Sequence, residues 1–487
     1  MKITAVQKRV SDLVWRFVPI TALIAFMSLV LARELVTPHR RLIKVSVAAA
    51  LLTLMFRFDM IYSLYLFIFL FPFPSAIYLG STNSILVTLI VLIWFIRSHS
   101  ERQRFFPKTE IDKFVLLLFG AYIVSLFNVD TFQGIKQGLT ITWRQVSAFA
   151  FFYLIVRFVT DEEKLVRITK IIAFATGLVF LTGVIELFFP GAAIIPGWIH
   201  LGKRLGMGML KYRVEGIRLG GAVTSHGMLA DFATVTLFFI AYYFIRAKNP
   251  FSKFVWTTIG FVTFVVMLAT ANRGAFFGFI LGVVYFLYLF RKKISIIKYV
   301  SFLVIFLGLF ALGQTFLEKY TVAASITQRI RGTQFKGVVP ETRVGTWKPA
   351  LVKSTEHILI GHGPAYEHGR HGTPERWPHN GYIFYLYTVG LVGLSAFLVI
   401  VYRIAKLSLS FKGKSIWETN LGNLAAILHI QLVMLLFEQL RTDHQRDNIY
   451  IYFIWMIFGL IVAASRIIRK REEEEGREEE PAPVPST

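Results

Sequence analysis

Long apolar runs separated by short polar segments occupy most of this chain. A helix needs ~20 apolar residues to cross a bilayer, and several runs are shorter than that, so the pattern predicts twelve to fourteen membrane-spanning helices. The runs lie at 17–32, 42–56, 60–79, 83–97, 111–127, 144–159, 165–189, 223–246, 253–271, 274–290, 296–316, 380–402, 421–440 and 448–466.

The composition agrees with a chain that is embedded in lipid. Hydrophobic residues make up 55% of the 487 residues and charged residues 17%, and the mean hydropathy is +0.59. A water-soluble protein could not cover this much apolar surface. The chain has no cysteine, which excludes disulfides, zinc–thiolate sites and thiol catalysis. The sequence therefore predicts an all-α, polytopic integral membrane protein.

The formal net charge of +24 is concentrated in short clusters between the apolar runs. Such clusters are typical of cytoplasmic loops, so their positions orient the chain and require no nucleic-acid partner. The resulting domain prediction is a cytoplasmic N-terminus (1–16), a transmembrane bundle (17–316) with an outward loop (190–222), a large, partly helical periplasmic loop before the third-last helix (317–379), C-terminal transmembrane helices (380–466) and a disordered cytoplasmic tail (467–487).

One basic cluster disagrees with this orientation. It lies between the first two apolar runs, on the predicted outer side, so either one of these runs is re-entrant or this loop breaks the rule. Its members are Arg33, Arg40, Arg41 and Lys44.

Both predicted outward loops are basic. Residues 317–379 hold nine Lys/Arg against five Glu, and residues 190–222 hold five Lys/Arg against one Glu. This excess opposes the bias that membrane insertion produces. We therefore expect an anionic ligand on the outward side.

Charged side chains within or directly beside the apolar runs lie near the outward helix ends. The set comprises Glu186, Asp231, Arg273, Glu438 and Arg441. Taken singly, each fits a snorkelling or helix-capping residue. Together they predict a polar site at the outer membrane interface, away from the midplane where transporters bind their substrates.

Two arginines and one histidine in the outward segments suit chemistry on an anionic headgroup. Arg218 and Arg343 carry guanidinium groups, which bind phosphate oxygens bidentately. His379 stands where the chain re-enters the bilayer, and an imidazole can accept a proton from an attacking hydroxyl. Each also fits a surface arginine or a helix-start histidine.

Three further histidines, in GHGPAYEHGRHG, raise the question of a metal site. No Cys or Asp accompanies them, and the neighbouring Arg370 and Arg376 would repel a cation. We therefore predict no metal there. The histidines are His362, His368 and His371.

The loop before the third-last helix resembles the C-terminal signature of the O-antigen ligase/polymerase superfamily of bacterial envelope enzymes. The resemblance rests on R-x-x-x-W (Arg343–Trp347), Gly361-x-Gly363, His379–Asn380 and Gly390-Leu-Val-Gly393, in that order.

Two further elements resemble the family less closely. Asn272-Arg273-Gly274 is similar to its serine-arginine-glycine element, with Asn in place of Ser. Arg218 matches an arginine-glycine element loosely, because Ser225 and His226 stand where a proline-asparagine pair is usual. The resemblance covers about residues 200–400.

The resemblance implies an inverting glycosyltransferase of the bacterial inner membrane that needs no cofactor or obligatory metal. Its donor is a glycan on undecaprenyl pyrophosphate, and its acceptor is a sugar hydroxyl on the periplasmic side, such as that of lipid A–core. Carried over, Arg218, Arg273 and Arg343 would hold the pyrophosphate. His379 would deprotonate or orient the acceptor. Supporting polar residues would be Glu186, His226, Asp231, Asn380, Glu438 and Arg441.

Other functions stay open at this point. A polymerase that joins repeat units, or a ligase that glycosylates protein, would share these motifs. A flippase for lipid-linked oligosaccharide predicts broken helices, and the only candidate for a break is the FPFP at 71–74. A scaffold whose basic loops bind anionic headgroups is the remaining alternative.

Overall fold

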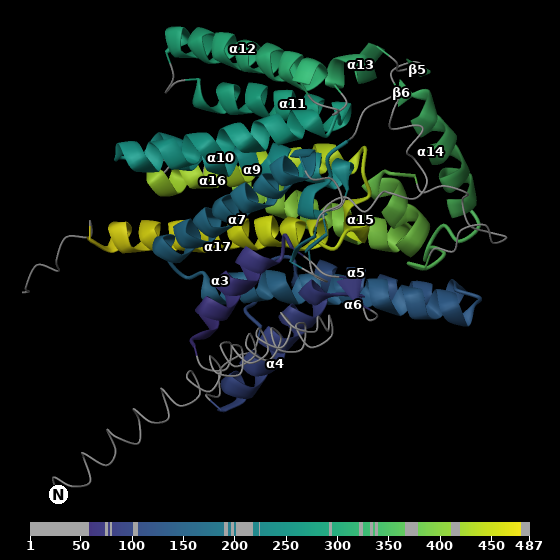
Figure 1. Cartoon of the computed structure of the whole chain (residues 1–487). Helices are drawn as coiled ribbons and strands as arrows, with labels where there is room; N and C mark the ends of the chain where they lie inside the picture. Colours follow the sequence, from purple (N-terminus) through teal and green to yellow (C-terminus); the bar gives the residue numbers. More distant parts are fainter. Residues whose placement is uncertain are drawn as a thin grey trace, which may run out of the picture.

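The computed structural model describes most of the chain as a bundle of long helices (Figure 1). The described residues are 58–73, 76–77, 80–100, 106–188, 193–195, 199–200, 218–223, 225–291, 295–320, 325–331, 335–336, 339–365, 378–410 and 419–478. The first two apolar runs and the discordant basic cluster lie outside them, as do His368 and His371.

Nine helices of this part are long and apolar enough to cross a membrane. They are α4 (Thr82–Ser100), α6 (Phe132–Phe158), α7 (Glu162–Phe188), α9 (His226–Arg246), α10 (Pro250–Ala269), α11 (Arg273–Phe290), α15 (Gly381–Leu409), α16 (Asn420–Gln439) and α17 (Tyr450–Glu478). The prediction of an all-α, polytopic membrane protein is confirmed.

The remaining elements are shorter, apart from α12. The helices are α3 (Met60–Leu70), α5 (Asp112–Ser125), α12 (Ile296–Tyr320), α13 (Ile326–Arg331) and α14 (Glu341–Ser354), with the 3-10 turns η1 (Leu126–Asn128), η2 (Gly221–Val223) and η4 (His444–Arg446). Three antiparallel hairpins pair β1 (Ala76–Ile77) with β2 (Gly80–Ser81), β3 (Ala193–Ile195) with β4 (Ile199–His200), and β5 (Phe335–Lys336) with β6 (Val339–Pro340).

Side-chain caps set where several helices begin, because the first backbone N–H groups of a helix lack partners within it. Thr131 accepts from the N–H of Gly134 and starts α6 twelve residues before the apolar run at 144–159. Asn249 caps α10, which continues with Pro250 at its first turn. Asn272 caps α11, accepting from the N–H of Ala275 at 3.2 Å.

Six helix ends meet at one end of the bundle, which we call the site end. It holds the starts of α9, α11, α15 and α17 and the ends of α10 and α16. Contacts between these termini fix the arrangement, because Asn380 before α15 donates to the carbonyl of Leu440 after α16. Helix α14 lies across the same end (Figure 1).

Basic clusters between the described helices lie at the opposite end. Arg471 of α17 pairs with Glu162 at the start of α7 at 3.3 Å, and Arg466 donates to the carbonyl of Val156 near the end of α6. Arg246 and Arg291 close α9 and α11 there. The separation of charge along the bundle agrees with the orientation that the sequence indicates.

The C-terminal tail differs in part from the expected disorder. Helix α17 continues to Glu478, and Lys470 and Glu474 lie one helical turn apart with a 3.7 Å ion pair. Glutamate, lysine and arginine are good helix formers, so the helix extends past the apolar residues. Residues 479–487 lie outside the described part of the chain.

Helix α15 is broken at Gly390, where φ is 65°. Residues 358–363 of the preceding loop fill the break. Their carbonyls at Ile358 and Leu359 accept from the N–H groups of residues 391 and 392, and the N–H groups of residues 362 and 363 donate to the carbonyls of residues 387 and 388. All four backbone groups freed by the break are therefore paired.

We call the docking of residues 358–363 into the α15 break the interlock. Glycine is required on both sides of it. A Cβ on Gly390 would lie 2.3 Å from the carbonyl of Leu359, and one on Gly361 would lie 2.5 Å from the backbone of Thr388. The two glycine motifs of the family signature thus pack against each other. The expectation that 71–74 is the only candidate for a helix break is wrong, although α3 does end at Leu70, just before that segment.

Candidate functional site

His379 and Asp443 form the half-exposed centre of the polar region. The His379 Nδ1 atom lies 3.5 Å from Asp443 Oδ1. The Asp443 side chain is 1% exposed and that of His379 is 47% exposed, so the imidazole reaches solvent while its carboxylate partner does not. Nδ1 faces the carboxylate, which leaves Nε2 for a reacting group.

Backbone geometry holds His379 in this place. Its φ is +47°, a left-handed conformation that is uncommon for residues other than glycine and that clusters at functional sites. The next residue, Asn380, caps α15 by accepting from the N–H groups of Tyr382 and Ile383 at 3.0 and 3.1 Å. Its Nδ2 donates to the carbonyl of Leu440 at 2.9 Å. Asn380 is thus a positioning residue that ties His379 to the turn carrying Asp443.

Two guanidinium groups accompany this pair. Arg446 Nε lies 3.2 Å from Asp443 Oδ2. Arg343, on α14, is largely buried; burial lowers the pKa of its guanidinium, and the negative charge of Asp443 partly offsets that effect. An arginine remains charged at neutral pH under such a shift. Positive charge therefore flanks the imidazole from both α14 and η4.

Arg218 and Arg273 lie at the turn between α10 and α11. Arg218 donates from Nε to the carbonyl of Thr270 at 3.1 Å and from Nη2 to that of Ala271 at 3.4 Å. Arg273 is the first residue of α11 and is half-buried. The N-terminus of a helix attracts anions, so this turn adds a second positive region at the site end.

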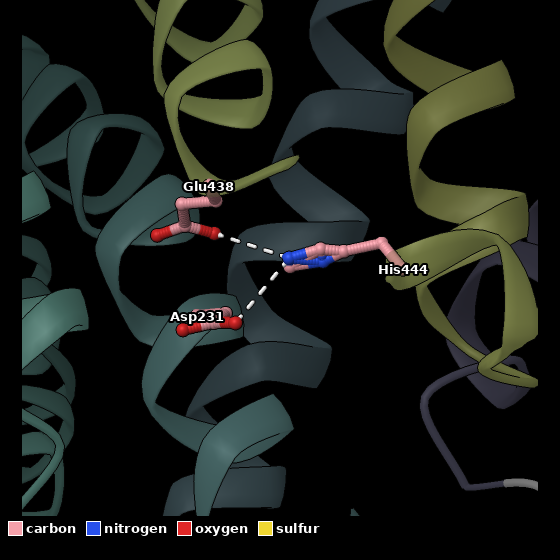
Figure 2. Close-up of side chains that lie close together, drawn as sticks. All are labelled: Asp231, Glu438 and His444. Carbon is pink, nitrogen blue, oxygen red and sulfur yellow. Dashed lines mark ion pairs between the residues drawn. The ribbon is translucent and has the colours of Figure 1, made fainter. Parts of the chain in front are cut away.

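A buried polar cluster lies between the two positive regions. Figure 2 shows its three members Asp231 of α9, Glu438 of α16 and His444 of η4 directed toward one another. The side chains of all three are 0% exposed. They gather at the site end although they come from three separate segments.

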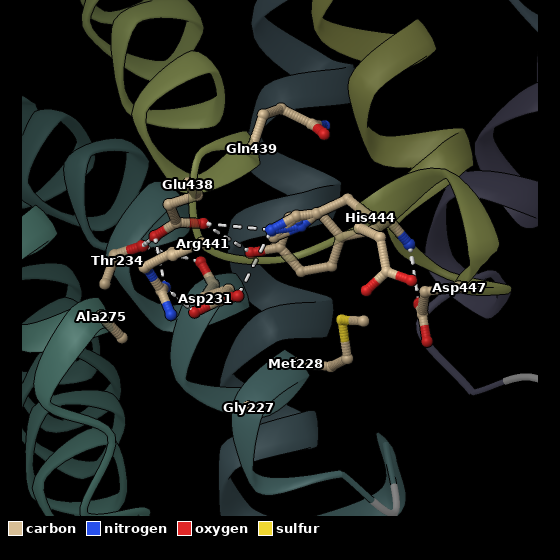
Figure 3. Close-up of polar contacts among 12 residues, drawn as sticks. Gly227, Met228, Asp231, Thr234, Ala275, Glu438, Gln439, Arg441, His444 and Asp447 are labelled. Atoms are coloured by element: carbon tan, nitrogen blue, oxygen red, sulfur yellow. Dashed lines mark hydrogen bonds and ion pairs between the residues drawn. The ribbon is translucent and has the colours of Figure 1, made fainter. Parts of the chain in front are cut away.

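Arg441 joins this cluster to the α11 start (Figure 3). It pairs with Asp231, lies 3.5 Å from Glu438 Oε1 and donates to Asn272 Oδ1 at 3.3 Å. A Cβ on Gly274 would lie 2.7 Å from Arg441 Cδ. The glycine of the Asn-Arg-Gly element therefore makes room for Arg441.

Glu438 is also held by two hydroxyl groups. Thr234, on α9, donates to its Oε1, and Tyr450 donates to Oε2 at 3.1 Å. Burial lowers the pKa of Arg441 to about 10, so Arg441 still carries its charge at neutral pH. The cluster is thus a fixed scaffold that joins the start of α9 and the end of α16 to the starts of α11 and α17.

The remaining candidate residues have structural contacts. Glu186 Oε2 accepts from the N–H groups of Gly220 and Gly221 at 2.8 and 2.6 Å, which holds the backbone that follows Arg218. His226 is the first residue of α9, next to the capping residue Ser225. His362 contacts the carbonyl of Lys353 through Nε2 at 2.7 Å and stacks on Tyr387 within the interlock.

The sequence prediction included Arg441 but missed the residues that follow it, up to Asp447. Asp443, His444 and Arg446 all come from this short connection between the last two helices. Its composition, RTDHQRD, is a run of seven polar residues at a predicted outward turn. Two or three residues would suffice to join antiparallel helices. The length and polarity of this run were therefore the available signal that it carries functional residues.

Comparison with known proteins identifies one family. Residues 258–398 match the family described as O-antigen ligase, a segment that includes Arg273, Arg343, His379 and both sides of the interlock. No curated protein matches the chain. The helical architecture is that of a multi-pass membrane protein, and its segment 258–398 is similar to the O-antigen ligase family.

Proposed function

We propose that this protein transfers a glycan from undecaprenyl pyrophosphate to a sugar hydroxyl of lipid A–core, acting as an O-antigen ligase in the bacterial inner membrane. The single observation that carries the proposal is the His379–Asp443 pair flanked by Arg343 and Arg446. A half-exposed imidazole backed by a buried carboxylate is suited to accept a proton.

The proposed reaction is a direct displacement with inversion. The acceptor oxygen forms a bond to the anomeric carbon of the glycan, and its proton passes to His379 Nε2. The bond between that carbon and the pyrophosphate oxygen breaks, and the pyrophosphate keeps the electron pair. Asp443 stabilises the imidazolium that forms, as a buried carboxylate does in a catalytic triad.

Fixed guanidinium groups would stabilise the leaving group. Charge gathers on the pyrophosphate as the bond breaks, so donors that are already in place favour the transition state over the ground state. In this proposal Arg343 acts from α14, while Arg218 and Arg273 act from the α10–α11 turn. These groups supply the charge compensation, so the proposed transfer step requires no metal ion.

The position of the site suits a polyprenyl donor. The polyprenyl tail stays in the bilayer while the diphosphate lies at its surface, and the candidate residues gather at one end of the bundle. The basic clusters at the opposite end support a periplasmic position of the site end in this proposal, through the positive-inside bias.

Two observations weigh against a flippase. The α15 break is filled by residues 358–363 of the same chain, whereas broken helices of transporters line a substrate cavity. The Arg441–Asp231–Glu438 cluster also lies at helix ends. A polymerase of the same superfamily would use the same chemistry with another glycan as acceptor, so the product distinguishes the two enzymes.

The test is a transfer assay with purified protein in nanodiscs, undecaprenyl-pyrophosphate glycan as donor and lipid A–core as acceptor. Mass spectrometry of the products should show glycosylated lipid A–core. His379→Ala should lower the rate by at least about a hundredfold, and His357→Ala, an exposed histidine of the same loop, should not. Elongated donor would indicate the polymerase instead. Donor that crosses the bilayer without bond cleavage, or full activity of His379→Ala, would contradict the proposal.

A further inference from the structure

The buried cluster of Asp231, Glu438 and His444 has an open polar face. His444 Nε2 lies 3.3 Å from Asp231 Oδ2 and 3.8 Å from Glu438 Oε2. Despite these short distances, neither ring nitrogen of His444 forms a hydrogen bond, and neither does Asp231 Oδ2. Buried polar atoms without a partner are costly. The unpartnered His444 Nε2 and Asp231 Oδ2 atoms, with Glu438 Oε2 close by, therefore favour a bound ligand.

Neighbouring groups fix the direction of these atoms. Arg441 pairs with the other oxygen of Asp231 and lies near the other oxygen of Glu438, while Tyr450 stacks on the His444 ring with centroids 3.8 Å apart. The unpartnered Asp231 Oδ2 and the Glu438 Oε2 atom, which also accepts from Tyr450, therefore face Nε2. Outer contacts that orient the ligating side chains in this way are a regular feature of metal sites.

The electrostatics favour a cation. With both carboxylates ionised and His444 neutral, the two carboxylates and the Arg441 guanidinium give the cluster a net charge of about −1, which a bound cation would compensate. A neutral imidazole offers its lone pair as a metal ligand. A proton on Nε2 would be shared along a hydrogen bond, and the geometry here does not form one.

The distances suit a small tetrahedral ion. Zinc bonds of 2.0–2.2 Å to nitrogen and oxygen place neighbouring ligand atoms about 3.3 Å apart, close to the 3.3 and 3.8 Å observed. All three ligand atoms lie within 4.8 Å of one another. We propose that Asp231, Glu438 and His444 form a structural binding site for a divalent transition-metal ion of the zinc type.

Such an ion would clamp the connection that carries the functional residues. The ion would link α9 and α16 to η4 through His444. This residue lies in the connection between Arg441 and Arg446. Asp443, the partner of His379, precedes His444 directly. The ion is separate from the proposed transfer chemistry, because its ligands are 0% exposed whereas His379 is 47% exposed.

The test measures metal binding without any glycan substrate, so its result is independent of the proposed transfer reaction. The full chain is purified with a tag that contains no histidine, stripped with a chelator and titrated with Zn²⁺ or Co²⁺. We expect about one tightly bound ion per chain, a higher melting temperature on binding and, for Co²⁺, the visible absorption of a tetrahedral complex.

A matched pair of variants assigns the site. His444→Gln should lose the bound ion and the thermal shift. His429→Gln should keep both, because His429 is a buried histidine of α16 that bonds Tyr285 and Ser408. Asp231→Asn and Glu438→Gln provide further ligand changes if His444→Gln fails to fold. Wild-type protein that binds no ion, or an ion unaffected in all three ligand variants, would overturn the proposal and leave a proton as the occupant.

Discussion

Asn380 Nδ2 donates to the carbonyl of Leu440 at 2.9 Å, which joins the start of α15 to the turn after α16. The bond places His379 beside Asp443, although 64 positions separate these residues in the sequence. The relative position of the imidazole and the carboxylate thus depends on the side-chain amide of Asn380.

Asn380→Asp should separate this role from helix capping. A carboxylate can still accept from the N–H groups of residues 382 and 383, but it cannot donate to Leu440. We expect the transfer rate to fall about tenfold, corresponding to roughly 1–2 kcal/mol for a lost buried hydrogen bond, with little change in the donor KM. Asn249→Asp, at the α10 cap of the opposite end, is the control and should leave the rate unchanged. An equal loss in both variants would mean that the bond to Leu440 plays no special part.

Arg343 offers a test of guanidinium recognition. Arg343→Ala should lower kcat by about a hundredfold, as removal of an oxyanion donor does. Arg343→Lys keeps the charge but loses the planar fork, so we expect an intermediate rate, about tenfold below wild type. Rates measured at saturating donor distinguish this order from a simple effect on affinity. If Arg343→Lys were as active as wild type, bidentate contact would play no part.

The interlock predicts that adding a single methyl group at Gly390 strongly lowers the stability of the protein. Gly390→Ala places a Cβ 2.3 Å from the carbonyl of Leu359 at a residue whose φ is 65°, so the segment must leave the break. We expect a loss of roughly 3 kcal/mol or more, because strain and unpaired backbone groups add. Thermal denaturation followed by size-exclusion chromatography measures it.

Gly120→Ala is the matched control for this variant. It lies in α5, where a Cβ meets nothing within 4 Å, and alanine favours helix by about 1 kcal/mol over glycine. The control should therefore be neutral or slightly stabilising. A Gly390→Ala protein as stable as this control would mean that the interlock contributes little.

Asp447 predicts a pH-dependent stability. Burial raises the pKa of its carboxyl, against the hydrogen bonds it accepts from the N–H groups of Ile449 and Tyr450. As pH rises above the unfolded pKa of about 4, the unfolded chain loses its proton first, and the native protein loses stability until its own raised pKa is passed. Asp447→Asn keeps the helix cap and removes this titration.

The melting temperature of Asp447→Asn relative to wild type should accordingly increase from about pH 4 toward neutral pH. Both proteins are compared in the same detergent and at the same salt concentration. A difference that shrinks as the pH rises would contradict the assigned direction.

Much of the architecture follows from the sequence because the longer apolar runs match the length that a bilayer demands. The runs at 223–246 and 421–440 became α9 and α16 almost residue for residue. The break in α15 escaped prediction, because hydropathy does not record φ and Gly390 stands in an unbroken apolar run. The family motif nevertheless pointed to both of its glycines.

The candidate site was predictable only where a residue type is informative by itself. His379 and Arg343 stood out by their motif and position. Asp443 and His444 did not stand out, because their roles depend on contacts that the sequence does not show. His444 packs against α9, and Asp443 pairs with a residue 64 positions earlier in the chain. Glu186 is the opposite case: the sequence predicted it as a site residue, and its buried carboxylate accepts from two backbone amides.

The docking of residues 358–363 into α15 also limits how substrates enter and leave. Undocking would strip four main-chain groups of their partners beside lipid, at a cost of several kcal/mol for each group. The docked residues 358–363 thus fix the loop that carries Arg343 and His379 to α15. We expect donor and acceptor to exchange while residues 358–363 stay docked.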